Sequence, residues 1–520
     1  MTAVAALSKR TRTHAVAVVS VGLSALIALV VSLANGPRTI DDAFITYRYA
    51  ANLSDGLGFV FNAGEQVLGT TTPLYTLALS SVGVVGLDLV QVSLVIGALA
   101  AAGNVCLVHL YVQHLGASRL TAVLTALLLA VAFPATMGVG NGMEAHVFVL
   151  VVLSSLVLSN VGHPRAAVAM ASVSALIRPE GVLAVVLVLI ATYVRRRPAL
   201  KASLVTVAMT TAPWVAFAFV YFGSPIPNSV QAKSGDAFSL VTALPEGRFG
   251  RRLFNHFNDS LLGPTWDVLS GEGNTLVSSL GWLIALAAIG ITVARVVRQG
   301  NRSIVLVGYP AAYFAFHFLS GVSGVSIQSW YLSPLTPFYL AMTMMGIEVG
   351  GRVLVRNHWR TVSLAAFVLL FAGQISALDL GQGQGLEFST RSNLEREHLY
   401  ARAARDLEPE VDLTTVIAAA EIGSLGYHSS ASILDTLGLV SPESARFYPI
   451  DPREAVPGVE NAMPTNLILE LRPDYVVSLE VFIRESLLKS EVFDNAYEQV
   501  AFYPAQAFGS NGLYVFRIRS

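Results

Sequence analysis

Charged residues and cysteine are both scarce in this chain of 520 residues. Charged side chains make up 13% of it, against roughly 25% in an ordinary soluble domain, and 54% of its residues are hydrophobic. This balance excludes a soluble globular protein and indicates a multi-pass membrane protein. Cys106 is the only cysteine, which excludes an intrachain disulfide. The net charge is −1 and the basic residues are dispersed, so we expect no nucleic-acid partner.

The N-terminus lacks the small-residue cleavage pattern of a secretory signal peptide. Lys9, Arg10 and Arg12 precede an apolar run at 15–34, which is about 20 residues long and ends in NGPRTI. We therefore predict a retained first transmembrane helix that enters the membrane from the cytoplasm.

Long hydrophobic runs recur along the first three quarters of the chain. Including the first run, eleven apolar segments are predicted to cross the membrane: 15–34, 89–112, 119–137, 145–160, 165–178, 180–195, 203–222, 276–298, 303–321, 334–351 and 361–379. The shorter apolar stretch at 73–86 is predicted to be an interfacial helix on the outer side.

Clusters of Arg and Lys orient these segments. The clusters at 195–201, 294–302 and 351–360 belong in the cytoplasm by the positive-inside rule. Counting crossings between them then places every polar cluster that could carry chemistry on the outer face: 36–72, 138–146, 177–181, 223–235 and 321–334. The sequence thus predicts a plasma-membrane protein that works at its extracytoplasmic face.

Hydropathy falls after about residue 380 and stays low. Short β-branched runs alternate there with amphipathic helical stretches, which is typical of a small α/β domain. We predict a membrane domain at 1–380, a linker rich in glycine and polar residues at 381–393, and an extracytoplasmic α/β domain at 394–520.

An acidic pair follows the first apolar run directly, in DDAFITYRYAANL. If this stretch is helical, Asp41 and Arg48 share one face, and Asp42 and Tyr49 share the neighbouring one. We expect Tyr49 to contact the substrate. Two adjacent acids repel each other, so the pKa of one should rise unless a cation is near. The alternative is an interfacial helix whose charges face water and lipid headgroups.

A resemblance to a known family rests on several motifs in order. The acidic pair is followed by RYAANLSDGLGFVFNAGE, GTTTPLYTL, NGMEA, IRPEG, PIPNSVQAKSG, WYLSPLTPFYL and EIGSLGYHSSASILDTLGLVSP. Together they resemble the GT-C superfamily of glycosyltransferases that use polyprenyl-phosphate sugars. The order is most similar to actinobacterial terminal arabinofuranosyltransferases of the cell wall, and more distantly to protein O-mannosyltransferases and lipid A aminoarabinose transferases.

The resemblance implies an α-helical GT-C fold and an inverting glycosyl transfer on the outer face. A hydroxyl of a cell-wall glycan or lipoglycan attacks the anomeric carbon of an arabinofuranose or mannose-like sugar, and the lipid phosphate leaves. A carboxylate base must take the hydroxyl proton. In the family this role belongs to the first-loop acid, which here is Asp41 or Asp42, and we favour Asp41.

The leaving phosphate needs positive charge, and three cations on the outer face are candidates: Arg48, Arg178 and Lys233. A divalent cation held by Asp42 and Glu144 is an alternative, since hard cations prefer oxygen ligands. Each candidate also has a structural interpretation. Glu144 suits a helix N-terminus, Arg178 suits an ion pair with Glu180, and Lys233 suits an ordinary surface.

Trp330 and Tyr331 suit either the aromatic belt at the membrane surface or faces for the isoprenoid chain or a sugar ring. His146 and His317 are expected to be satisfied core histidines. Two other functions stay open: a transporter or flippase of a lipid-linked sugar, and a non-catalytic envelope scaffold that binds glycan. Polar residues gathered on one face, with no half-repeat, favour the transferase over the transporter.

Overall fold

The computed structural model describes residues 2–228, 275–300, 303–322, 329–376, 388–457, 459 and 461–519. Its contacts divide the chain into two compact units. The bundle unit comprises Met1–Pro37, Ser93–Pro213 and Phe238–Gly385, and the sheet unit comprises Arg38–Val92, Trp214–Ala237 and Leu386–Ser520. The division therefore does not follow chain order, and it differs from the predicted boundary near residue 380.

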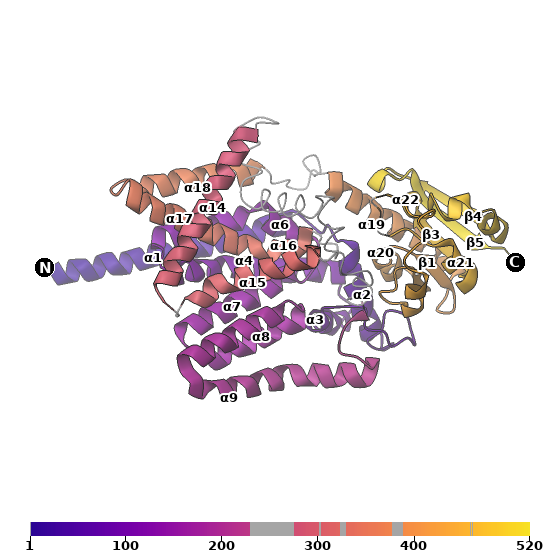
Figure 1. Cartoon of the computed structure of the whole chain (residues 1–520), viewed down its shortest axis with the longest axis horizontal. Coiled ribbons are helices and arrows are strands. Elements are labelled where there is room, and N and C mark those ends of the chain that lie inside the picture. Colours follow the sequence, from indigo (N-terminus) through magenta and orange to yellow (C-terminus); the bar gives the residue numbers. More distant parts are fainter. Residues whose placement is uncertain are drawn as a thin grey trace. The chain divides into compact units, whose positions relative to one another are not determined.

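Helices make up the described part of the bundle unit, and Figure 1 labels most of them. They are α1 (Thr2–Ala34), α4 (Leu89–His114), α5 (Arg119–Val131), α6 (Phe133–Gly140), α7 (Ala145–Val161), α8 (Pro164–Ile177), α9 (Gly181–Phe222), α14 (Thr275–Arg298), α15 (Ile304–Val322), α16 (Ser329–Leu332), α17 (Thr336–Leu354) and α18 (Trp359–Ser376). The first residues of α4, 89–92, and the last residues of α9, 214–222, belong to the sheet unit. Within the described residues, each predicted apolar segment falls on one of these helices or on two successive ones.

Three helical stretches in the described residues are long and apolar enough to cross a membrane: Ala15–Ala34, Leu89–His114 and Gly181–Phe222. Several apolar helices are shorter, among them α5, α7 and α8. The helical membrane class is thus confirmed, whereas the number of crossings stays a prediction. The segments predicted at 180–195 and 203–222 form one helix that is broken at Arg196, where φ is −148° and ψ is 63°.

The sheet unit combines the stretch after α1 with the C-terminal part of the chain. Its helices are α2 (Asp41–Ser54), α3 (Pro73–Gly83), α19 (Phe388–Leu407), α20 (Gly423–Tyr427), α21 (Thr465–Leu471), α22 (Glu480–Ile483) and α23 (Glu491–Ala496). Its strands are β1 (Val416–Ala419), β2 (Ser432–Asp435), β3 (Tyr475–Leu479), β4 (Tyr497–Pro504) and β5 (Gly512–Ile518). The short helix predicted at 73–86 is α3.

The strands form one sheet in the order β2-β1-β3-β5-β4. β1 pairs in parallel with β2 and β3, and β5 pairs antiparallel with β3 and β4. The predicted C-terminal α/β domain is therefore confirmed as a fold. Of the predicted linker, residues 381–387 lie outside the described residues, and residues 388–393 already belong to α19.

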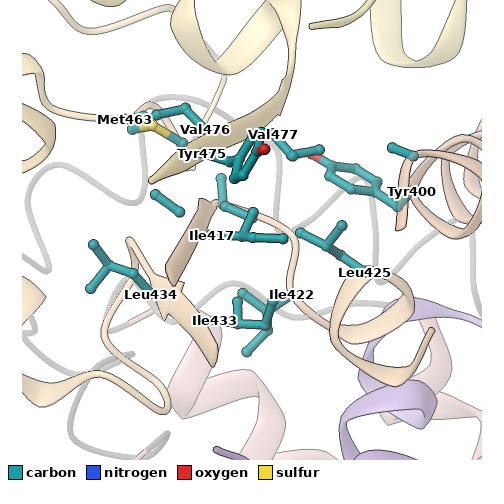
Figure 2. Close-up of a cluster of buried hydrophobic side chains, with 14 of the residues drawn as sticks. Tyr400, Ile417, Ile422, Leu425, Ile433, Leu434, Met463, Tyr475, Val476 and Val477 are labelled. Atoms are coloured by element: carbon teal, nitrogen blue, oxygen red, sulfur yellow. The ribbon is translucent and has the colours of Figure 1, made fainter. Parts of the chain in front are cut away.

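One hydrophobic core holds the sheet unit together. Figure 2 shows its centre, where Ile417, Ile433 and Val476 of the sheet lie near Leu425 of α20. The same core takes in apolar side chains from the stretch after α1: Ile45, Tyr49, Phe59, Phe61 and Leu68. Burial of shared apolar surface explains why 38–92 groups with the C-terminal residues and not with the helices that follow it in sequence.

Candidate active site

The acidic pair begins α2, as the sequence predicted. Ile40 is extended, and Asp41 and Asp42 lie in the first helical turn, where carboxylates complement the helix dipole. Asp41 is 8% exposed, and Arg48 on the same helix is equally buried. The interpretation of α2 as an interfacial helix whose charges face water is therefore wrong for Asp41 and Arg48.

Backbone groups of α20 hold the Asp41 carboxylate. Its Oδ1 accepts hydrogen bonds from the N–H of Gly423 at 2.8 Å and of Ser424 at 3.3 Å. In the described part of the chain, no hydrogen bond to its Oδ2 is found. One carboxylate oxygen is thus fixed, and the other is available for a further contact.

Charged side chains of the C-terminal segment surround Asp41. Arg396 on α19 lies 3.2 Å from Glu421 (Nη1 to Oε2) and 2.6 Å from Glu397 (Nη2 to Oε1). Glu421 Oε1 accepts a hydrogen bond from Asn461 at 3.0 Å, and Ser424 Oγ donates to the Glu397 carbonyl at 2.8 Å. We call Asp41, Arg396, Glu397 and Glu421 the carboxylate cluster.

The carboxylate cluster has more acids than the single guanidinium can balance. Burial raises the pKa of Asp41 to about 7; Glu421 and Asp42 add to the rise, while Arg396 opposes it. Burial likewise raises the pKa of Glu397 to about 8 against the pull of Arg396. Asp41 therefore changes protonation near neutral pH, where a general base is most effective.

Arg48 and Tyr49, both predicted to contact the substrate, form hydrogen bonds to backbone groups. Arg48 donates from Nε to the Phe61 carbonyl at 3.1 Å, from Nη2 to the Ala431 carbonyl at 3.1 Å, and from Nη1 to the Ser429 carbonyl. Burial lowers the pKa of Arg48 to about 10, so it stays charged at neutral pH. These bonds give Arg48 a structural role and lend no support to the predicted phosphate contact.

Tyr49 is fully buried, and its hydroxyl closes the loop that follows α2. It donates to the Val67 carbonyl at 2.6 Å and accepts from the Gly69 N–H at 2.8 Å. Two hydrogen bonds occupy the hydroxyl on both sides. Tyr49 therefore shapes the loop, and its predicted substrate contact stays a prediction.

A second group of buried charges lies in the bundle unit. Arg178, in the turn between α8 and α9, is 3.1 Å from Glu144 (Nη1 to Oε1) and 3.3 Å from Glu180 (Nη2 to Oε1). His317 Nε2 lies 3.6 Å from Glu180 Oε1. We call Glu144, Arg178, Glu180 and His317 the arginine cluster. Glu144 and Arg178, both predicted site residues, are in contact with each other. The structure also places Glu180 and His317 beside them.

Aromatic rings enclose the arginine cluster. The Arg178 guanidinium carbon lies 5.8 Å from the ring centre of Phe148 and 5.5 Å from that of Tyr331. Among the residues that the structure describes, buried Glu180 Oε2 and both buried ring nitrogens of His317 have no hydrogen-bond partner. His317 is thus not the satisfied core histidine that the sequence suggested, since such atoms normally have partners.

The other predicted site residues, Trp330, Asp42 and Lys233, belong to neither cluster. Trp330 is half-buried, with its ring centre 6.2 Å from that of Tyr331, and Asp42 is half-buried. Lys233 lies outside the described residues. Asp42 and Glu144 belong to different units, and no three His, Cys, Asp or Glu side chains in the described ranges are placed to hold a metal ion. The metal stays a prediction.

Sequence reasoning missed Arg396 and Glu397. They lie in the stretch LEREH of α19, where charge on an amphipathic helix normally indicates a solvated face. Both are buried beside Asp41 in the folded chain. No local signal could have distinguished them from the exposed charges around them.

Comparison with known proteins supports the fold. A family model described as a domain of unknown function (DUF8728) matches residues 391–516. No curated protein matches the sequence. The Archaeoglobus fulgidus oligosaccharyltransferase in its apo form is similar in structure, with 13% identity, a TM-score of 0.54 and coverage of 96% of this chain and 74% of that one.

Another similar structure is apo ArnT from Cupriavidus metallidurans, with 14% identity, a TM-score of 0.51 and coverage of 97% of this chain and 98% of that one. The chain has the GT-C fold. This confirms the predicted fold class at the level of architecture. Arabinofuranosyltransferase AftD from mycobacteria matches with a TM-score of only 0.46 and over 41% of its own length, so the closer resemblance to arabinofuranosyltransferases stays a prediction.

Proposed function

We propose that the protein is a glycosyltransferase that moves a sugar from a polyprenyl-phosphate donor to an acceptor hydroxyl at the extracytoplasmic face of the plasma membrane. The observation that carries the proposal is Asp41, a buried carboxylate just after the first apolar helix with a pKa of about 7. The GT-C fold supports it. The oligosaccharyltransferase AglB from Archaeoglobus fulgidus, with a TM-score of 0.54, has been solved with an inhibitory peptide and a dolichol-phosphate.

The reaction needs one base. The acceptor oxygen attacks the anomeric carbon, the bond from that carbon to the phosphate oxygen breaks, and the lipid phosphate leaves with the electron pair. Asp41 takes the hydroxyl proton through Oδ2, because Oδ1 is held by Gly423 and Ser424. A single displacement of this kind inverts the configuration at the anomeric carbon.

The arginine cluster suits sugar hydroxyls better than phosphate. Arg178 already lies between Glu144 and Glu180, so these three residues sum to one positive and two negative charges. A phosphate would be repelled by that net charge, whereas a neutral sugar would not. Glu180 Oε2 and the His317 nitrogens can accept from and donate to hydroxyl groups. We therefore assign Arg178 and Glu144 to the sugar side of the donor.

The remaining features of the proposal come from the sequence. Lys233 is the cation we propose for the phosphate, and Trp330 and Tyr331 are proposed to face the isoprenoid chain or the sugar. The sugar is proposed to be arabinofuranose or mannose-like, and the acceptor a cell-envelope glycan. As an alternative role for Glu144, the sequence suggests a divalent cation held with Asp42, which would stabilise charge on the leaving phosphate. Loss of transfer after chelation, restored by Mg²⁺ or Mn²⁺, would support it.

The proposal is tested with purified full-length protein in lipid nanodiscs. Radiolabelled polyprenyl-phosphate arabinofuranose and mannose are each supplied with arabinan and mannan oligosaccharide acceptors, and the wild type is compared with Asp41→Asn. We expect label to enter one acceptor with inverted anomeric configuration, and to enter it about 10²- to 10⁴-fold more slowly with Asp41→Asn than with the wild type. Movement of intact donor across the bilayer of a proteoliposome, with no label in any acceptor, would indicate a flippase instead.

A further inference from the structure

The contact between Asp41 and the C-terminal segment joins residues that are 382 positions apart in sequence. Gly423 and Ser424 stand at the start of α20, in the motif EIGS, and both of their backbone N–H groups point at Asp41 Oδ1. They fall within the region matched by the family model of unknown function.

Gly423 leaves no space between α20 and α2. A Cβ atom at this position would lie 2.0 Å from the Asp41 carbonyl oxygen and 2.8 Å from its Oδ1. The first distance is far below any real Cβ contact, and the obstacle is backbone, so α2 or α20 would have to move. The absence of a side chain at Gly423 is thus a condition for the position of the Asp41 carboxylate.

Side chains from α19 and beyond hold this part of α20 in place. Ser424 Oγ donates to the Glu397 carbonyl at 2.8 Å, which ties the start of α20 to α19. Glu421, two residues before Gly423, is bound on one side by Arg396 and on the other by Asn461. The Arg396 guanidinium also stacks on the Phe508 ring at 5.3 Å. The two N–H groups are therefore presented to Asp41 by a rigid support.

We infer that Gly423 and Ser424 are positioning residues for the catalytic base, and that the C-terminal segment is a component of the active site. This inference rests on the proposed function, in which Asp41 accepts the proton of the acceptor hydroxyl. The two N–H groups hold Oδ1 and thereby aim Oδ2. Misplacement of a reacting group by about 1 Å can cost about 100-fold in rate.

The test compares Gly423→Ala with Gly426→Ala in the full-length protein. Gly426 lies one turn further along α20, and a Cβ there would meet the Phe61 ring at 2.7 Å and Ile433 Cγ1 at 3.4 Å, so this variant perturbs the packing of α20 without touching Asp41. We expect Gly423→Ala to lower kcat by about 100-fold with the donor KM within about twofold. Gly426→Ala should keep kcat within about threefold, as expected for a change that leaves Asp41 in place.

A double variant separates positioning from general damage. If Gly423 acts through Asp41, Gly423→Ala should have no further effect on the residual rate of Asp41→Asn. Ser424→Ala, which keeps the N–H but loses the tie to α19, should give a smaller loss that also vanishes in the Asp41→Asn background. Multiplicative losses, or equal losses from Gly423→Ala and Gly426→Ala, would overturn the inference.

Thermal unfolding of the same variants gives a readout without substrate. Because Gly423 and Asp41 touch, the drops in Tm of Gly423→Ala and Asp41→Asn should not add in the double variant. Additive drops would contradict the contact itself. If the drops are non-additive and yet no donor is turned over by the wild type, the proposed function fails while the contact stands. If Gly423→Ala does not fold, Ser424→Ala alone decides the kinetic test.

Discussion

At the scale of single residues, burial decides the chemistry of the carboxylate cluster. Asp41 is a typical surface residue by type, yet it lies beside Glu421 and Glu397 with one guanidinium among them. Desolvation and like charge both favour its protonated form. The residue therefore holds its proton at mildly acidic pH and releases it near neutrality, which is the behaviour required of a base.

Turnover should follow the ionisation of Asp41. A general base works only when deprotonated, so kcat is expected to rise with pH and to level off above about 7, the pKa of Asp41. Asp41→Asn should lower kcat by about 10²- to 10⁴-fold, the usual contribution of such a base, and leave donor KM largely unchanged. Asp42→Asn is the matched control, and a dead Asp42→Asn with an active Asp41→Asn would reverse the assignment.

Turnover is expected to rise with pH, whereas the stability of the folded protein is expected to fall. Glu397 has a pKa of about 8 in the folded protein against an ordinary value of 4.5. Its contribution to stability is complete below the ordinary value and is lost as pH rises through about 8. We expect Tm of the purified protein to fall between pH 5 and pH 9, and Glu397→Gln to flatten that fall. Glu443→Gln, at an exposed position of the same unit, should leave the wild-type slope unchanged.

At the scale of elements, Arg48 links α2 to two other segments of the sheet unit. Its guanidinium binds the carbonyls of Phe61, Ser429 and Ala431, so a single side chain fixes the loop after α2 and the turn before β2. A buried carbonyl oxygen that loses its charged donor lowers the free energy of unfolding. The loop after α2 and the turn before β2 therefore depend on the Arg48 side chain for their shape.

Replacement of Arg48 should accordingly affect folding more than donor binding. Arg48→Met leaves the buried carbonyls of Ser429 and Ala431 without the Arg48 donor, whereas the Phe61 carbonyl keeps a hydrogen bond from Asn52 Nδ2 at 2.7 Å. We expect the substitution to destabilise the protein by about 3–5 kcal/mol. Arg48→Lys, which keeps one charge but not the fork, should be intermediate. Measured Tm values and donor KM of the folded fraction provide the check. A raised donor KM with unchanged Tm would restore the phosphate role.

At the scale of the whole molecule, the C-terminal residues cannot be separated from the stretch after the first apolar helix. Ile45, Tyr49, Phe59 and Phe61 lie in the same core as Ile417. Removal of the C-terminal part would expose these side chains to water and release Asp41 and Arg48 from their partners. Such exposed apolar surface normally promotes aggregation.

Truncation should therefore abolish more than acceptor binding. We expect the chain ending at residue 385 to elute as aggregate in detergent and to lose binding of undecaprenyl phosphate, in contrast to a chain that lacks only residues 1–8. Size-exclusion chromatography and a lipid-binding assay give the measurements. A monodisperse truncated protein with full lipid affinity would show that the shared core is dispensable.

The membrane class, the positions of the apolar helices and the C-terminal α/β fold all followed from the sequence. Hydropathy, charge clusters and periodicity are properties of short stretches of chain, so they can be read locally. Asp41, Glu144 and Arg178 were also found this way, because their residue types stand out next to apolar runs.

Only the tertiary structure decided the partners of these residues. The N–H groups of Gly423 and Ser424, and the buried charges Arg396 and Glu397, reach Asp41 through packing of segments more than 350 positions apart. The same packing gives Arg48 three backbone carbonyl partners that its local sequence does not indicate. The pKa and the role of a charged side chain depend on what buries it, and burial is a property of the folded chain, not of its local sequence.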